Sequence, residues 1–155
     1  MSSFAGAPNS LLRFIHYPPR ALYALGLGLL IGKLILLLTT TGRKSGLPRV
    51  TLLQYEEVDG VITVGAARGR QADWVRNIAA DPKVMIRVGR RQFHGIAEIV
   101  SDVSHIADFL ELRLQRHPTM VGAMLRSEDL PVPPSRAQLE AYAAGLTVVD
   151  IHKKL

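Results

Sequence analysis

The chain has 155 residues and no cysteine, which excludes disulfide bonds, thiolate metal sites and a cysteine nucleophile. Hydrophobic residues make up 48% of the chain and charged residues 21%, as in globular domains. The net charge of +6 points either to an anionic partner or to a well-solvated surface.

Residues 1–32 are predicted to form an N-terminal helical segment, with one short helix at residues 11–15 and a second at residues 20–30. Residues 21–38 are apolar except for Lys33. A membrane span needs ~20 such residues, and an internal lysine together with three glycines argues against one. Peripheral contact of these helices with the inner face of the cell membrane stays open, alongside a cytoplasmic location.

Residues 33–155 are predicted to contain six strands and to form one domain with the N-terminal segment. The Asp59-Gly60 pair between two β-branched runs indicates a tight hairpin. A helix is expected at residues 72–80, and further helices begin at Ser101 and Ser135. The order β-β-β-α-β-β-α-β indicates a mainly β (α+β) domain built on an antiparallel barrel. The predicted strands are 33–41, 49–58, 61–64, 84–88, 93–99 and 146–151.

The turn between the first two strands is a predicted anion site. Two glycines flank Arg43, Lys44 and Ser45, and such glycines allow successive N–H groups to converge on an anion. Arg49 follows a few residues up the returning strand, within reach of the same anion. The spacing differs from a P-loop and no helix follows, which excludes nucleoside triphosphate hydrolysis. The alternative at this point is a charged surface hairpin.

Small residues at the end of the third strand allow a ligand to approach the backbone closely. Ala66 and Ala67 lie there, followed by Arg68. On the next helix, Trp74 and Asn77 are one turn apart. Their alternatives are core packing for the tryptophan and a helix-to-strand hydrogen bond for the asparagine.

Other chemistries lack support in the sequence. The five histidines show no HxxxH or HExxH spacing, so no metal site is expected. A GxSxG elbow is absent, which argues against a hydrolase. Aromatic residues make up only 6% of the chain and no nucleic-acid-binding module is recognisable, so no nucleic-acid partner is expected.

Two motifs together resemble the deazaflavin-dependent nitroreductase family of actinobacteria. They are TTTGRKSGLPRVT at residues 39–51 and GAARGRQADWVRNIAADPKVMIRVG at residues 65–89. The resemblance implies a six-stranded split β-barrel of the FMN-binding type with N-terminal, mid-chain and C-terminal helices. It also implies coenzyme F420, an 8-hydroxy-5-deazaflavin with a phosphate and an oligoglutamate tail. FMN is the second cofactor choice.

The resemblance implies a role for each matching residue. The residues implied to bind the phosphate and the acidic tail are Arg43, Lys44, Ser45 and Arg49. The edge of the deazaflavin ring is implied to contact Ala66, Ala67 and Arg68. The wall behind the ring is implied to be formed by Trp74 and Asn77.

The implied activity is an F420H2-dependent oxidoreductase that passes a hydride to an apolar acceptor such as a quinone or a nitro compound. Tyrosines that line the substrate side in the best-known branch are missing from residues 117–125, so their proton donation does not carry over. Met120, Met124 and Leu125 instead predict an apolar, adaptable pocket. Apart from water, His117 is the one side chain considered as an acid, and no catalytic residue is assigned.

Three other functions stay open. One is an FMN-dependent reductase on the same barrel, which the choice of cofactor would reveal. Another is a non-catalytic carrier of F420 or a lipid, which would bind cofactor without oxidising it. The third and least favoured is a nucleic-acid module, which would show steep salt-dependent binding to DNA or RNA. The oligomeric state is left open as well.

Overall fold

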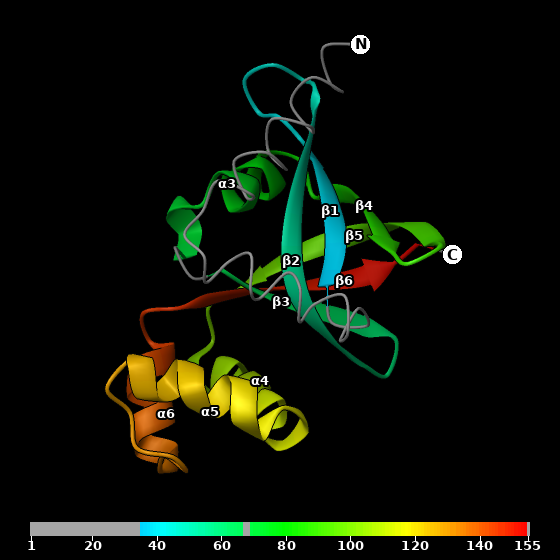
Figure 1. The fold of residues 1–155 in the computed structure, drawn as a ribbon. Helices are drawn as coiled ribbons and strands as arrows, with labels where there is room; N and C mark the ends of the chain where they lie inside the picture. The colour runs from blue at the N-terminus through cyan, green and yellow to red at the C-terminus, as the bar shows by residue number, and fades with distance from the viewer. Residues whose placement is uncertain (1–34, 67–68, 155) are drawn as a thin grey trace.

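The computed structural model describes residues 35–66 and 69–154 (Figure 1). The two helices predicted near the N-terminus lie outside the described residues, as do the predicted ring-edge residues Ala67 and Arg68. The division into a helical segment at residues 1–32 and a barrel at 33–155 therefore stays a prediction.

Six antiparallel strands close into a barrel, as the element order predicted. Around the barrel the order is β1-β2-β3-β6-β5-β4, with β4 pairing back onto β1. Closure pairs every strand on both sides and leaves no open sheet edge. The strands are β1 (Ile35–Thr41), β2 (Pro48–Val58), β3 (Val61–Ala66), β4 (Lys83–Val88), β5 (Arg91–Val100) and β6 (Thr147–Lys153).

The barrel interior is filled by alternate residues of each strand, because successive side chains of a strand point to opposite faces. In β1 the buried positions are Leu36, Leu38 and Thr40, and in β4 they include Ile86. Gly95 of β5 serves close approach: a Cβ there would lie 2.8 Å from Ile151 Cγ2 on β6. The alternating apolar pattern in the sequence thus specified which face of each strand is inside.

Turn residues connect neighbouring strands as expected. Asp59 and Gly60 have φ angles of 52° and 81°, the positive pair that a two-residue hairpin requires. This turn joins β2 to β3 in register, with Val58 opposite Val61.

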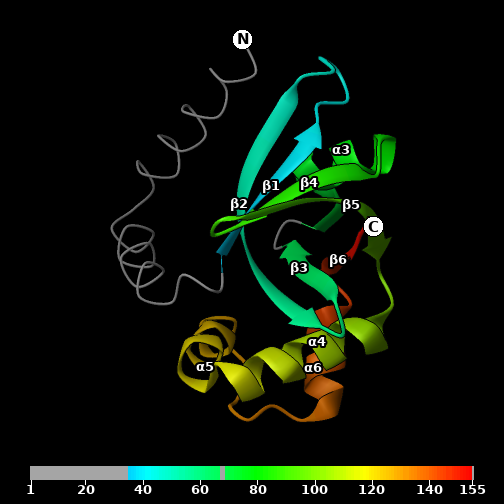
Figure 2. The same ribbon diagram turned by 90° about the vertical axis from the view of Figure 1, so that its right-hand side faces the viewer.

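Four α-helices are described beside the barrel. After the 3₁₀ turn η1 (Gly69–Gln71), α3 (Asp73–Ala80) contacts β1 and β5. The other three form a bundle below the barrel in both ribbon views (Figures 1 and 2). Their bounds are α4 (Val103–Arg116), α5 (Pro118–Ser127) and α6 (Arg136–Ala143). None of the helices in the described residues is long and apolar enough to cross a membrane.

Capping side chains set where the bundle helices begin. Ser135 and Gln138 form the predicted capping box of α6. The prediction for α4 was wrong by one residue, because Asp102 rather than Ser101 caps it and accepts from the His105 amide at 3.0 Å. A carboxylate at this position also interacts favourably with the positive end of the helix dipole.

Candidate functional site

The β1–β2 turn is held in shape by hydrogen bonds between its ends. The Gly42 amide donates to the Leu47 carbonyl at 2.8 Å, and the Gly46 amide donates to the Gly42 carbonyl at 2.7 Å. Gly46 has a φ of 72°, and a Cβ on Gly42 would lie 2.7 Å from Ser45 Oγ. Both glycines are therefore required by the shape of this turn.

Arg43 attaches the turn to α3. Its main-chain amide and its Nη1 both donate to Asn77 Oδ1, at 3.1 and 3.0 Å, and Nη2 lies 3.3 Å from Asp73 Oδ1. Asn77 is 4% exposed and donates through Nδ2 to Thr40 Oγ1 at 3.3 Å. The Arg43 side chain is 23% exposed, so α3 orients it while part of it still faces solvent.

Lys44, Ser45 and Arg49 form the exposed part of the turn. Arg49 Nη2 donates to Ser45 Oγ at 3.4 Å, which brings the returning strand back to the turn as predicted. Neither Lys44 nor Arg49 forms an ion pair with any acidic residue that the structure describes. Two positive charges on and next to this turn thus lack an acidic partner among the described residues, which suits an anionic ligand.

The remaining predicted site residues have clear packing roles. Trp74 is half-buried and packs against the barrel core. Asn77 makes the helix-to-strand hydrogen bond described above. Ala66 is buried at the end of β3, where it lines the pocket described next.

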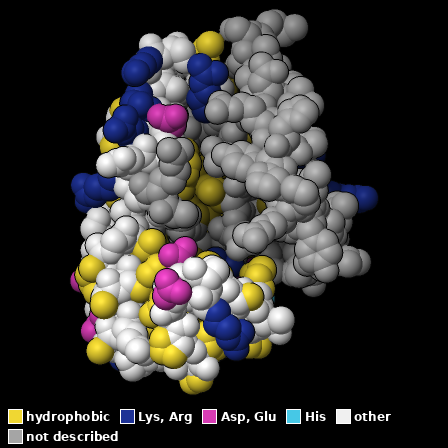
Figure 3. All heavy atoms as spheres, turned by 60° about the vertical axis from the view of Figure 1, so that its left-hand side comes forward, with side chains coloured by type: hydrophobic (Ala, Val, Ile, Leu, Met, Phe, Trp, Pro, Cys, Tyr) yellow, Lys and Arg dark blue, Asp and Glu magenta, His cyan; other side chains and the backbone are white. Residues whose placement is uncertain are grey.

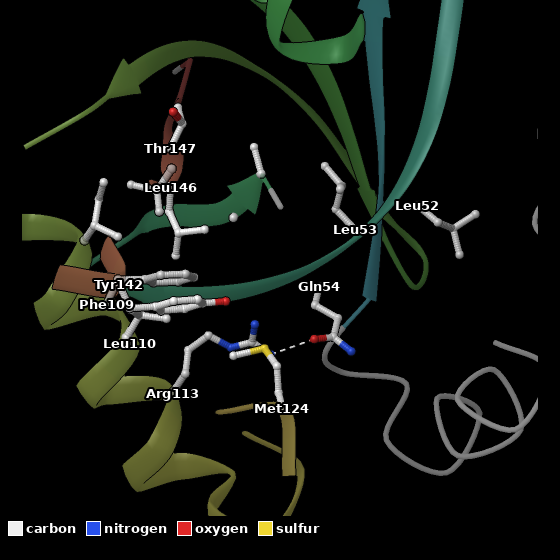
Figure 4. A pocket seen from close by; sticks show the side chains of 14 residues that line it. Leu52, Leu53, Gln54, Phe109, Leu110, Arg113, Met124, Tyr142, Leu146 and Thr147 are labelled. Carbon is white, nitrogen blue, oxygen red and sulfur yellow. Dashed lines mark hydrogen bonds between the residues drawn. The ribbon is translucent and has the colours of Figure 1, made fainter. Parts of the chain in front are cut away.

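A pocket of about 260 Å³ lies between the barrel wall and the helical bundle. Strands β2, β3 and β6 form one side, and α4, α5 and α6 the other (Figure 4). On the face shown in Figure 3, basic side chains gather toward the end that carries the β1–β2 turn, and hydrophobic side chains are visible below them. The lining residues are Leu52, Leu53, Gln54, Gly65, Ala66, Ile106, Phe109, Leu110, Arg113, Met124, Tyr142, Leu146, Thr147 and Val148.

Among the residues that the structure describes, Arg113 is the one charged residue that lines the pocket, and it is 8% exposed. Its Nη2 donates to Gln54 Oε1 at 2.7 Å, and its guanidinium lies 5.9 Å from the centre of the Phe109 ring. Burial lowers the pKa of Arg113, an effect that nearby Glu56 partly opposes. The side chain nevertheless stays charged at neutral pH, since arginine starts far above it.

Glu56 is 4% exposed and is surrounded by positively charged or donor groups. Its carboxylate lies 3.5 Å from Arg113 Nε, 3.1 Å from Arg116 Nη1 and 3.2 Å from His117 Nε2. His117 therefore contacts this carboxylate and is not among the residues that line the pocket. Its suggested role as an acid gains no support from this position.

The predicted apolar residues of α5 are divided between the pocket and the bundle. Met124 lines the pocket, Met120 accepts a 3.8 Å contact from Gln54 Nε2, and Leu125 is fully buried in the bundle core.

Sequence reasoning missed Arg113 and Tyr142. Both lie on the buried faces of amphipathic helices: Arg113 is four residues after Phe109, and Tyr142 is three after Leu139. That spacing is the signal that would have placed them on the inner face. Burial and, second, Glu128 raise the pKa of Tyr142, so its phenol stays protonated at neutral pH.

Strand β2 connects the basic turn to the pocket. Arg49 lies near its start, and Leu52 to Gln54 line the pocket. Because a strand rises ~3.3 Å per residue, Arg49 and the pocket-lining residues of β2 are roughly 10–16 Å apart along the strand. A ligand with an anionic end and a flat apolar end would extend between them.

A closed antiparallel barrel with helices packed beside it defines a split-barrel protein. An F420 reductase has the same fold, with a TM-score of 0.52 and 22% identity over 79% of this chain and 88% of that one. An F420-H2 dependent reductase (FDR-A) gives a TM-score of 0.51 at 22% identity, over 77% and 93%.

The family follows from the sequence match. The model of the F420H(2)-dependent quinone reductase family matches residues 22–133, and the chain belongs to this family. An F420H(2)-dependent quinone reductase of Mycobacterium tuberculosis is 36% identical over 80 residues, which are 50% of this chain and 52% of that protein. The chain thus spans about half the length of the curated relatives it matches. The resemblance to deazaflavin-dependent proteins is confirmed at the level of family and fold.

Proposed function

We propose that this protein is an oxidoreductase that transfers a hydride from F420H2 to a quinone-like acceptor. The observation that carries the proposal is the pairing of basic residues without an acidic partner at the start of β2 with an apolar pocket beside the middle of the same strand. Membership of a family described as F420H(2)-dependent quinone reductases supports the same conclusion. The proposed unit is a single cofactor-binding domain formed by residues 1–155.

The anionic part of the cofactor fits the β1–β2 turn. Lys44 and Arg49 supply charge that no described carboxylate neutralises, and Arg43 presents a fork held in place by α3. Arginine forks and lysine ammonium groups both bind phosphate and carboxylate oxygens. We assign the phosphate and acidic tail to these three residues and Ser45.

The ring of the cofactor is assigned to the other end of the site. Ala66 lines the pocket and has a side chain small enough for a flat ring to lie against the backbone. Ala67 and Arg68 continue this edge in the proposal. Trp74 and Asn77 stay in the proposal as the wall behind the ring, although neither lines the pocket, and Asn77 also orients Arg43 at the phosphate end.

The bound reduced deazaflavin supplies the hydride. Phe109, Leu110 and Met124 supply an apolar wall that holds the acceptor and excludes water. At about 260 Å³ the pocket is slightly smaller than the roughly 300–1,000 Å³ common for ligand pockets, so we assign its interior to one compact acceptor ring and its Ala66 edge to the deazaflavin ring. A long apolar tail on the acceptor would have to extend out of the pocket.

We include contact with a membrane surface in the proposal, through residues 1–32 at the inner face of the cell membrane. Acceptors of the quinone class with long tails partition into lipid, and residues 21–38 contain one charge. Sedimentation of the full chain with vesicles of neutral and of anionic lipid tests this contact. Equal amounts of protein in the supernatant with and without vesicles would contradict it.

The activity is tested by mixing the protein with F420H2 and 2-methyl-1,4-naphthoquinone and following cofactor oxidation. We expect oxidation that depends on both protein and quinone, and none when reduced FMN replaces F420H2. Met124→Trp should fill the pocket and lower kcat/KM for the quinone. Ala123→Trp, one residue earlier on the exposed side of α5, is the matched control and should leave the rate unchanged.

The carrier and the flavin reductase each have their own outcome in this experiment. Binding of F420H2 without oxidation by any quinone or nitro compound would indicate a carrier. Oxidation of reduced FMN at a higher rate than F420H2 would indicate a flavin reductase on the same barrel.

A further inference from the structure

The guanidinium of Arg113 lies at the pocket wall with part of its hydrogen-bonding capacity unused. A guanidinium has five N–H donors, and Nη2 uses one on Gln54 Oε1. Nε is buried and faces the Glu56 carboxylate at 3.5 Å without forming a hydrogen bond, whereas Nη1 donates to none of the described residues and is the free donor. Figure 4 shows the side chain extending from α4 toward Gln54 at the edge of the cavity. An oxygen of a bound ligand would provide the acceptor that the protein does not.

The charges around Arg113 leave a surplus of positive charge beside an apolar cavity. The Glu56 carboxylate is shared by Arg113, Arg116 and His117, and these four residues form the Glu56 cluster. The two arginines thus carry two positive charges against one negative charge, and no acidic residue lines the pocket within residues 35–66 and 69–154. In an environment with little water, such a surplus favours a negatively charged oxygen.

The position of Arg113 is maintained from β2 and α4 together. Gln54 and Glu56 project from β2 to two different nitrogens of the guanidinium, Nη2 and Nε, while the Phe109 ring lies one helical turn before Arg113 on α4. A side chain held on three sides loses little further conformational entropy when it binds a ligand.

We propose that Arg113 is the oxyanion-binding residue of this pocket, and that it selects ring-shaped acceptors with a conjugated carbonyl oxygen. Its role in turnover rests on the proposed quinone reductase function, whereas its preference for an anionic oxygen does not. The substrate class it favours is quinones whose reduction leaves a negative charge on oxygen.

The chemical balance of the step is that of a two-electron reduction. The quinone gains one bond to hydrogen and two electrons, while one C–H bond of the reduced cofactor breaks. The second quinone oxygen then carries the negative charge of a hydroquinone monoanion, which Arg113 stabilises by hydrogen bonding. A proton from water completes the hydroquinone, and the proton left on the oxidised cofactor returns to water.

The test compares two probes on the full-length protein without added cofactor. The first, 2-hydroxy-1,4-naphthoquinone, is an enolate anion at neutral pH, and the second, 1,4-naphthoquinone, is its neutral counterpart. Calorimetric titration gives the ratio of their dissociation constants. We expect the wild type to prefer the anion, and Arg113→Met to reduce that preference roughly tenfold to a hundredfold.

Arg116→Met is the matched control. It removes an equal charge from the same Glu56 cluster, but Arg116 does not line the pocket. We expect its preference for the anionic probe to stay within about twofold of the wild type. Arg113→Lys, which keeps the charge but loses the planar fork, should give an intermediate preference and serves if Arg113→Met does not fold.

The inference is overturned if Arg113→Met weakens the binding of both probes by the same factor, or if it changes the binding of neither probe. It is also overturned if Arg116→Met changes the preference as much as Arg113→Met, since Arg113 would then act only through Glu56. An Arg113→Lys preference equal to that of the wild type has the same consequence. The ratio of the two dissociation constants is measured without cofactor, so it is independent of the activity assay. The Arg113 inference can therefore be wrong while quinone reduction is observed. Likewise, F420H2 oxidation can be absent while the preference for the anionic probe is observed.

Discussion

Asn77 Oδ1 accepts two hydrogen bonds from Arg43, one from the main-chain amide at 3.1 Å and one from Nη1 at 3.0 Å. The two residues are 34 positions apart, on the β1–β2 turn and on α3. Because Asn77 also binds Thr40 through Nδ2, one buried amide connects the helix, the strand and the basic turn. The orientation of the proposed phosphate site therefore depends on a residue that need not contact phosphate.

Replacing Asn77 with alanine should destabilise the fold and weaken cofactor binding together. The change leaves the Thr40 hydroxyl and the Arg43 amide without their partner, which costs about 1–3 kcal/mol of unfolding free energy. Urea unfolding and titration with F420 measure the two effects. The control Arg76→Ala, on the exposed side of the same helix, should have an unfolding free energy within about 0.5 kcal/mol of the wild type. Equal stability of the two variants would contradict the role of Asn77.

The double variant Lys44→Ala/Arg49→Ala should weaken F420 binding roughly tenfold or more, because each residue is expected to bind an anionic oxygen. Rising salt should weaken binding by the wild type more than by the variant, since exposed charges are screened. Fluorescence quenching of F420 measures both effects.

The matched control for that variant is Arg90→Ala/Arg91→Ala, which removes the same charge from the β4–β5 turn. The register of β4 on β1, with Leu37 opposite Arg87, puts that turn at the opposite end of β1 from the basic turn. Loss of affinity in both double variants would mean that net charge, rather than a specific site, attracts the cofactor.

Glu56→Gln should lower the unfolding free energy by on the order of 3 kcal/mol, because the buried Arg113 loses its counter-ion. Glu57→Gln is the control at the next residue: its carboxylate pairs with Lys153 in a partly exposed ion pair, which contributes about 1 kcal/mol or less. Chemical denaturation of both variants provides the comparison. Similar losses in the two would show that the Glu56 cluster is no stronger than a surface ion pair.

Tyr55→Phe should reduce the loss of stability at alkaline pH. Burial in the barrel, as the largest cause, raises the pKa of Tyr55 above its ordinary value of 10.0. Above that value the unfolded chain releases the phenolic proton while the folded chain still holds it, so stability falls as pH rises. Unfolding free energies from neutral pH to about pH 11 should therefore diverge in favour of the phenylalanine variant. Parallel curves would mean that the phenol titrates alike in both states.

Local features of the fold were predictable because they depend on neighbours in the chain. The alternation of apolar residues in β1, the Asp59-Gly60 hairpin and the Ser135–Gln138 capping box each involve residues a few positions apart. The glycines around Arg43 likewise specify the shape of the basic turn. The family resemblance rested on the same short motifs, and the family match confirms it.

The pocket could not be derived in the same way, because its walls come from three strands and three helices. The sequence predicted an apolar pocket from Met124 but not the charged residue inside it, since an arginine on a helix is usually solvated. Arg113 becomes buried only when α4 packs on β2 and brings it to Gln54 and Glu56, more than 50 residues earlier in the chain.

By itself, the sequence determined the six strands, the tight basic turn and the family. Each of these follows from backbone geometry or short motifs that neighbouring residues impose on one another. Only the tertiary structure decided that Asn77 orients Arg43, and that Arg113 and Tyr142 face one cavity. Those relationships arise from closure of the barrel and packing of the bundle against it, which bring distant residues within hydrogen-bonding distance.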